Sequence, residues 1–205
     1  MRANGLALSA VTGLLITQTF AAALDVDITD ADIRRAIAVA ISPDGERERF
    51  HARYMVPVQD ATVEAMEVIT EFRRFVLACE EQLALGNWMV ARGGFDAKGQ
   101  TLKQILDASK GRVTVKARLR FHPHHSYATV PSVEILIGDP SYLPIDTVST
   151  PLLVSSEVGV SAGLTGAVIE TSFNAPSIEN RTVPVRIVFE GKDLVRQAVD
   201  FSLLD

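Results

Sequence analysis

The chain is poor in cysteine: Cys79 is its only cysteine in 205 residues, so no disulfide can form within the chain. The fold must therefore be stable without covalent cross-links. Cys79 lies in an apolar helical pattern between Leu77 and Leu83, which predicts a small, buried core residue. A reactive thiol would need a basic and partly exposed setting, and the sequence indicates no such setting here.

Positive charge is not in excess either, since the net charge at pH 7 is −5. A general nucleic-acid-binding protein usually carries a basic surplus, so we expect no nucleic-acid partner. Hydrophobic residues make up 47% of the chain and charged residues 22%, which allows a real core and excludes a disordered chain. We find neither a Walker A loop nor a GxGxxG turn after a strand, and we predict no nucleophile elbow. These missing motifs favour a binding protein over an enzyme.

The first 23 residues have the order of a secretory signal peptide. One arginine and no acidic residue come first, an apolar stretch from Leu6 to Phe20 follows, and small residues occupy 21–23. We expect cleavage after Ala23 and a periplasmic or secreted mature protein. The alternative is an uncleaved anchor, but the stretch contains Ser, Thr and Gln and is marginal for a bilayer about 30 Å thick. We expect no transmembrane span in the mature chain.

Residues 24–205 are predicted to form a single α+β domain. The expected fold is an antiparallel β-sandwich of about seven or eight strands, with two or three helices before and between the strands. The helices are expected near 28–41, 71–85 and 100–109. The segments with strand patterns are 47–58, 63–70, 112–121, 127–130, 132–138, 152–157, 166–174, 182–191 and 194–204. The last two are expected to form a hairpin, and the proline-containing segment 138–151 to cross between sheets.

The clearest of these patterns is the strand 112–121. Apolar side chains alternate along it with polar ones, which is typical of a half-buried antiparallel strand. The expected inward residues are Val113, Val115, Ala117, Leu119 and Phe121. The other face carries four cations, which we name the basic stripe: Arg112, Lys116, Arg118 and Arg120.

Two interpretations of the basic stripe are open. In the first, carboxylates of the same chain neutralise it, and Glu134 on the expected partner strand is suitably placed for a cross-strand pair. In the second, the stripe binds an anionic ligand such as a phosphate, an acidic sugar polymer or an acidic protein face. Arg49 and Arg53 would extend such a patch if the strand 47–58 lies alongside.

Three of the four histidines lie within 120–127, directly after the basic stripe. His122 and His124 are two apart and would share a face of an extended strand, which suits Zn²⁺ or Cu²⁺, with His51 or a carboxylate as third ligand. Against this, Pro123 indicates a strand end or edge, and His125 would point away. The alternatives are a solvated strand end and a patch that charges near the ordinary histidine pKa of about 6.5.

The sequence thus predicts a secreted or periplasmic, non-catalytic β-sandwich that binds a partner through the basic stripe or a sheet edge. One alternative is a metal-binding protein or metal-dependent hydrolase that uses the histidines of 122–125. Another is a structural component of a cell-envelope assembly, in which the segment 63–85 packs on another chain.

Overall fold

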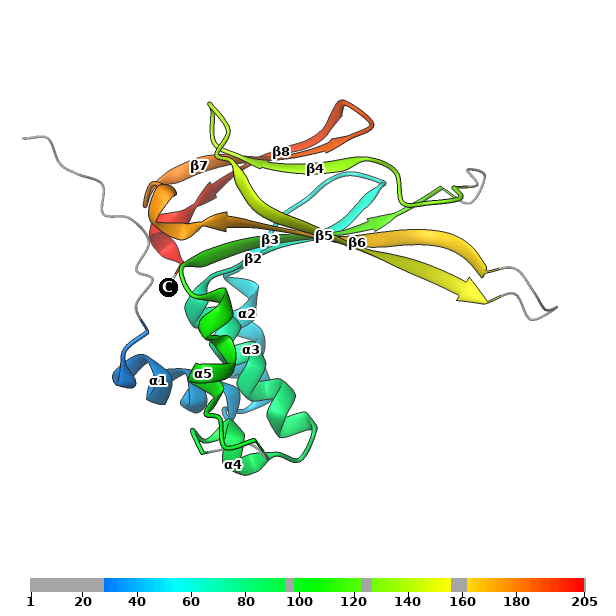
Figure 1. The fold of residues 1–205 in the computed structure, drawn as a ribbon. Coiled ribbons are helices and arrows are strands. Elements are labelled where there is room, and N and C mark those ends of the chain that lie inside the picture. Colours follow the sequence, from blue (N-terminus) through cyan, green and yellow to red (C-terminus); the bar gives the residue numbers. More distant parts are fainter. Residues whose placement is uncertain (1–27, 95–97, 123–126, 156–161, 205) are drawn as a thin grey trace, which may run out of the picture.

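The computed structural model describes residues 28–94, 98–122, 127–155 and 162–204 (Figure 1). Within these ranges the fold is α+β, as predicted, with eight strands in two antiparallel sheets and five α-helices. All five helices precede the third strand along the chain. None of the helices in these ranges is long and apolar enough to cross a membrane.

The helices form one layer next to the sheets (Figure 1). They are α1 (Asp30–Ala40), α2 (Asp44–Ala52), α3 (Glu71–Ala84), α4 (Trp88–Ala91) and α5 (Leu102–Leu106), which continues into the 3-10 turn η1 (Asp107–Ser109). The three predicted helices are confirmed as α1, α3 and α5 with η1. Thr29 caps α1, and its side chain and that of Asp32 form a capping box.

The larger sheet has the strand order β1-β2-β3-β6-β5, and the smaller sheet has the order β4-β7-β8. The first contains β1 (Met55–Val56), β2 (Val63–Ile69), β3 (Arg112–Arg120), β6 (Ala162–Asn174) and β5 (Pro144–Ser155). The second contains β4 (Val133–Ile137), β7 (Thr182–Phe189) and β8 (Lys192–Asp200). The predicted final hairpin is confirmed as β7–β8. Its turn residues Glu190 and Gly191 have φ of 48° and 77°, as a type I′ turn requires.

The two sheets share one apolar core, and the helices have another. The first core contains every inward residue predicted for β3, together with side chains of β4, β7 and β8 such as Ile135 and Ile187. The second contains Phe72, Val76 and Cys79 of α3. The alternation along β3 therefore identifies its buried face correctly.

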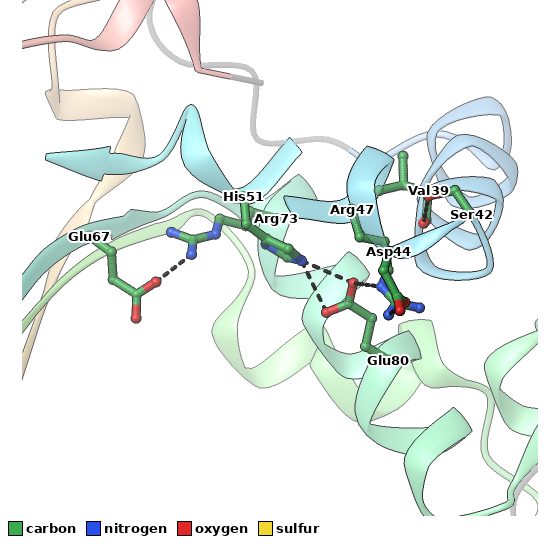
Figure 2. A network of polar contacts seen from close by, with 8 residues as sticks. All are labelled: Val39, Ser42, Asp44, Arg47, His51, Glu67, Arg73 and Glu80. Carbon is green, nitrogen blue, oxygen red and sulfur yellow. Dashed lines mark hydrogen bonds and ion pairs between the residues drawn. The ribbon is translucent and has the colours of Figure 1, made fainter. Parts of the chain in front are cut away.

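Arg73 and Arg74 of α3 connect the helical layer to the larger sheet. The buried guanidinium of Arg73 donates to the Val68 carbonyl oxygen at 2.6 Å and pairs with the Glu67 carboxylate (Figure 2). The Arg74 guanidinium donates to Thr114 Oγ1 at 2.8 Å, and its burial lowers the pKa of Arg74. Helix α3 therefore covers the Thr114 end of the outer face of β3, which is the face opposite the shared core.

The predicted strand 47–58 is wrong. The first half of this segment, 47–52, belongs to helix α2, and only Met55 and Val56 pair as β1. Phe50 and Tyr54 are four residues apart, so one helical turn brings both into the helical core. Acidic residues lie in the first turn of α2 and basic residues in its last, which suits the helix dipole.

Two smaller predictions also need correction. Residues 127–130 contain a bend at 128 and 129 and no strand. The segment 138–151 does cross from the smaller to the larger sheet, but β5 already begins at Pro144. Pro144 and Pro151 are compatible with a strand because β5 is an edge strand, where the missing N–H can face away from the neighbour.

Candidate functional site

The basic stripe lies on the outer face of the larger sheet, where its first two cations have carboxylate partners. Arg112 pairs with Asp146 of β5 at 3.1 Å. Lys116 lies 3.3 Å from Glu170 of β6 and 3.8 Å from Glu67 of β2. These acids lie on β2, β6 and β5 of the same sheet, so half of the stripe is neutralised within the sheet.

The predicted partner Glu134 is wrong, because it lies on β4, which belongs to the smaller sheet. The prediction assumed that strands consecutive in sequence pair with each other. Instead β3 pairs with β2 on one side and with β6 on the other. Arg49 and Arg53 do not extend the stripe along a neighbouring strand either, because Arg49 lies in α2 and Arg53 is its C-cap.

The last two cations of the stripe share a single carboxylate. The Nε atom of Arg118 donates to Glu64 at 3.0 Å, and the Arg120 guanidinium pairs with the same residue. The arginine side chains are 57% and 71% exposed, whereas that of Glu64 is 24% exposed. Two guanidinium groups against one carboxylate leave a local charge of +1. This end of the stripe is therefore the part able to bind an external anion.

A bulge shapes the larger sheet at the end of β3. Arg120, the last residue of β3, pairs with Gly166, and Gly166 pairs with Leu152. The next β5 residue, Leu153, pairs with Leu164, so Thr165 is an extra residue in β6. A bulge of this kind bends the strand and re-aims side chains. Beyond it the β5–β6 hairpin continues past β3, and its yellow end lies apart from the end of β3 in Figure 1.

A groove of about 990 Å³ occupies the space between this hairpin and the end of β3. Its charged lining residues are Glu64, Arg118 and Arg120, and the opposite side is mainly aliphatic. The remaining lining residues are Leu119, Phe121, Tyr127, Pro151, Leu152, Leu153, Val154, Gly163, Leu164 and Thr165. A largely apolar concavity with a few convergent polar groups is typical of a small-molecule site. We name it the β3 groove.

A second hollow of about 460 Å³ lies on the other side of Phe121 and Tyr127. The centres of these two rings are 5.0 Å apart, and each ring also packs against the ring of Phe189. His122 and Lys192 line this hollow. The aromatic cluster separates His122 from the groove that contains Arg118.

The structure describes two of the three histidines of the predicted metal site, His51 and His122, and they lie on different segments. His51 lies on α2, where its Nε2 atom is 3.0 and 3.1 Å from the two Glu80 carboxylate oxygens of α3 (Figure 2). His122 follows β3, and His124 lies outside the described residues. Within the described ranges no group of three or more His, Cys, Asp or Glu side chains is arranged to hold a metal ion. Zinc or copper at His122 and His124 stays a prediction.

The contact between His51 and Glu80 belongs to a polar network that joins α2 to α3 (Figure 2). Arg47 lies 3.8 Å from Glu80 and also pairs with Asp44. The Nδ1 atom of His51 is buried and has no hydrogen-bond partner among the described residues. Because one ring nitrogen is bound to Glu80 and the other is enclosed, this histidine holds two helices together and does not face a ligand.

The buried Cys79 has no setting that would activate it as a nucleophile. Cys79 is 0% exposed, and its burial, with a smaller effect of Glu80, raises the pKa of its thiol to about 12. The sequence prediction that a GxSxG motif is absent is wrong, because residues 159–163, Gly-Val-Ser-Ala-Gly, fit that pattern. That pattern can form a nucleophile elbow between a strand and a helix. Its serine, Ser161, lies outside the described residues, and Ala162 and Gly163 begin β6.

Comparisons with models of protein families, with curated proteins and with solved structures found no match to this chain. The candidate site therefore rests on the shape, the charge and the apolar wall of the β3 groove.

Proposed function

We propose that this protein is a periplasmic or secreted, non-catalytic β-sandwich that binds an anionic ligand in the β3 groove. The observation that carries this proposal is the pair of exposed guanidinium groups, Arg118 and Arg120, which share one carboxylate at the groove. The core shared by the two sheets supports the sandwich architecture. The order of residues 1–23 supports export from the cytoplasm.

A fluorescent anion tests the proposal. Anilinonaphthalene sulfonate carries one sulfonate and an apolar ring system, so both sides of the groove can contact it. We expect one molecule to bind per chain, and the double variant Arg118→Gln/Arg120→Gln to bind at least about tenfold more weakly, because charge-assisted hydrogen bonds are lost.

A matched control is available on another surface. Arg181 and Arg196 are 65% and 57% exposed, and each pairs with one carboxylate. Arg181→Gln/Arg196→Gln therefore removes the same charge from equally exposed positions. Equal binding losses in the two double variants would contradict a specific site at the β3 groove.

A second candidate function, a structural role in an envelope assembly, is favoured by an apolar tip of the helical layer. Leu85, Trp88 and Met89 are all exposed where α3 meets α4. Clustered exposed apolar side chains are typical of protein-binding surfaces. If this tip mediates assembly, light scattering should give a multimer that Trp88→Ser/Met89→Ser converts to a monomer; a monomeric wild type would remove self-assembly from consideration.

A further inference from the structure

We infer that the ligand of the β3 groove is a single-chain anionic amphiphile, such as a fatty acid, with its carboxylate on Arg118 and Arg120 and its aliphatic chain along the β5–β6 hairpin. This inference rests on the proposed function and adds the class of ligand. It follows from the way charge and apolar surface are divided within the groove.

The charged end of the groove fits one carboxylate. Glu64 accepts from both arginines but neutralises only one positive charge. An incoming carboxylate therefore supplies the missing negative charge, and the planar guanidinium of Arg120 can hold it with two parallel hydrogen bonds. A neutral or cationic headgroup would leave the excess charge uncompensated.

The other side of the groove fits an aliphatic chain. Leu152, Leu153, Val154 and Leu164 line it, and the side chains of Leu153 and Val154 are each 57% exposed. Leu152 and Arg120 both pair with Gly166, from β5 and from β3. The Leu152 side chain extends over Gly166, because a Cβ atom built on Gly166 would lie only 3.4 Å from Leu152 Cδ1. The aliphatic surface thus begins directly beside the guanidinium groups. A carboxylate attached to an alkyl chain can contact both at once.

An extended peptide fits the hairpin less well. Peptides that add to a sheet edge need a continuous row of backbone donors and acceptors. Pro151 pairs with Ala167 and Pro144 with Phe173. These partners are an even number of residues apart in β6, so both prolines are oriented alike toward β6. Both also lack an N–H. The outer edge of β5 is therefore interrupted at both positions, which favours a ligand held by side chains.

A series of carboxylates tests the inference on the purified protein, expressed with its N-terminal segment. Butyrate, octanoate and dodecanoate are titrated calorimetrically below their micelle concentrations. We expect affinity to rise with chain length, by up to about fourfold for each methylene buried. Dodecyl trimethylammonium and dodecyl maltoside carry the same chain with a cationic and a neutral head, and we expect both to bind at least about tenfold more weakly than dodecanoate.

Two sets of variants separate the head from the chain. Arg118→Gln/Arg120→Gln should weaken every carboxylate by a similar factor, whereas Leu153→Thr/Val154→Thr should reduce the gain per methylene. Val148→Thr is the control for the second set, because Val148 is also exposed on β5 but does not line the groove. It should leave the series unchanged.

Other results would overturn the inference. Affinity that depends on the arginines but not on chain length would refute the amphiphile and leave the proposed anion site intact. Carboxylate affinities that are unchanged in Arg118→Gln/Arg120→Gln would refute both, because the headgroup would then not contact the two arginines. No binding of any carboxylate, or equal competition by a short acidic and leucine-rich peptide, would refute this class of ligand, while the sulfonate probe would still report on the anion site.

Discussion

Gly166 is the residue on which the shape of the groove depends most directly. A Cβ atom there would overlap the Leu119 carbonyl oxygen and lie 3.3 Å from the Leu119 carbonyl carbon. Both are backbone atoms of β3, so they cannot rotate away. Gly166 therefore allows β3 and β6 to approach each other where the Thr165 bulge begins.

We expect Gly166→Ala to lower the free energy of unfolding by roughly 1–3 kcal/mol, because it forces the two backbones apart. Gly163→Ala is the control, since no heavy atom lies within 4 Å of a Cβ built on Gly163. Urea denaturation of both variants measures the difference. Equal stabilities would show that the backbone approach at Gly166 does not constrain the sheet.

Cys79 provides a test of the helical core. Burial raises the pKa of its thiol to about 12, so the nucleophilic thiolate is nearly absent at neutral pH. We expect a disulfide reagent to leave the native protein unmodified over hours at pH 8 and to label it within minutes in denaturant. Rapid labelling under native conditions would mean that α3 opens often or packs loosely.

At the scale of secondary-structure elements, Arg73 is the main polar connection between α3 and β2. Its guanidinium is buried, pairs with Glu67 and lies 5.0 Å from the centre of the Tyr54 ring. We expect Arg73→Ala to cost about 3 kcal/mol of unfolding free energy, because it removes a buried guanidinium from the Val68 carbonyl oxygen and leaves the partly buried Glu67 with only Lys116 at 3.8 Å.

The control for Arg73 is Arg34, an exposed residue of α1. Arg34→Ala should change stability by less than about 0.5 kcal/mol. Thermal or chemical denaturation compares the two variants. If Arg73→Ala is no more destabilising than Arg34→Ala, the connection between α3 and β2 depends on apolar packing alone.

The elements that the sequence predicts well are those with one buried face along their whole length. Strand β3 alternates at every residue, and α3 repeats its apolar residues at helical spacing, so each pattern indicates both the element and its core face. The spacing of Phe50 in α2 and Tyr54 just after it fits both a strand and a helix. Only packing against α1 and α3 decides between them, and that packing is not visible in the sequence.

The β3 groove could be predicted only in part, for a related reason. Arg118 and Arg120 are evident from the alternation, but Glu64 and the aliphatic wall come from strands distant in the sequence. One local signal was present: Gly163 and Gly166 lie within a strand pattern, and glycines there often mark a bulge. The strand order that places this bulge beside β3 depends on the whole fold.

At the scale of the whole molecule, positive charge is unevenly neutralised. The chain carries a net charge of −5, yet the lining of the β3 groove carries +1. A locally basic concavity in an acidic protein attracts anions to that part of its surface. Raising the salt concentration should therefore weaken ligand binding modestly, in proportion to a single charge.

The N-terminal segment gives a further prediction for the whole molecule. If residues 1–23 are a signal peptide, protein expressed with its own N-terminus in a bacterial host should be periplasmic and begin at Leu24. Intact mass spectrometry of the periplasmic fraction checks this. A full-length chain in the membrane fraction would instead indicate an uncleaved anchor.

The most direct test of the central claim is an NMR titration that observes the arginine Nε–H groups while decanoate is added. Arg118 and Arg120 should shift in a saturable manner, because their guanidinium groups contact the carboxylate. Arg181 and Arg196, which lie outside the groove, should not shift. Saturable binding without a shift at Arg118 and Arg120, or equal shifts at all four arginines, would contradict a ligand site in the β3 groove.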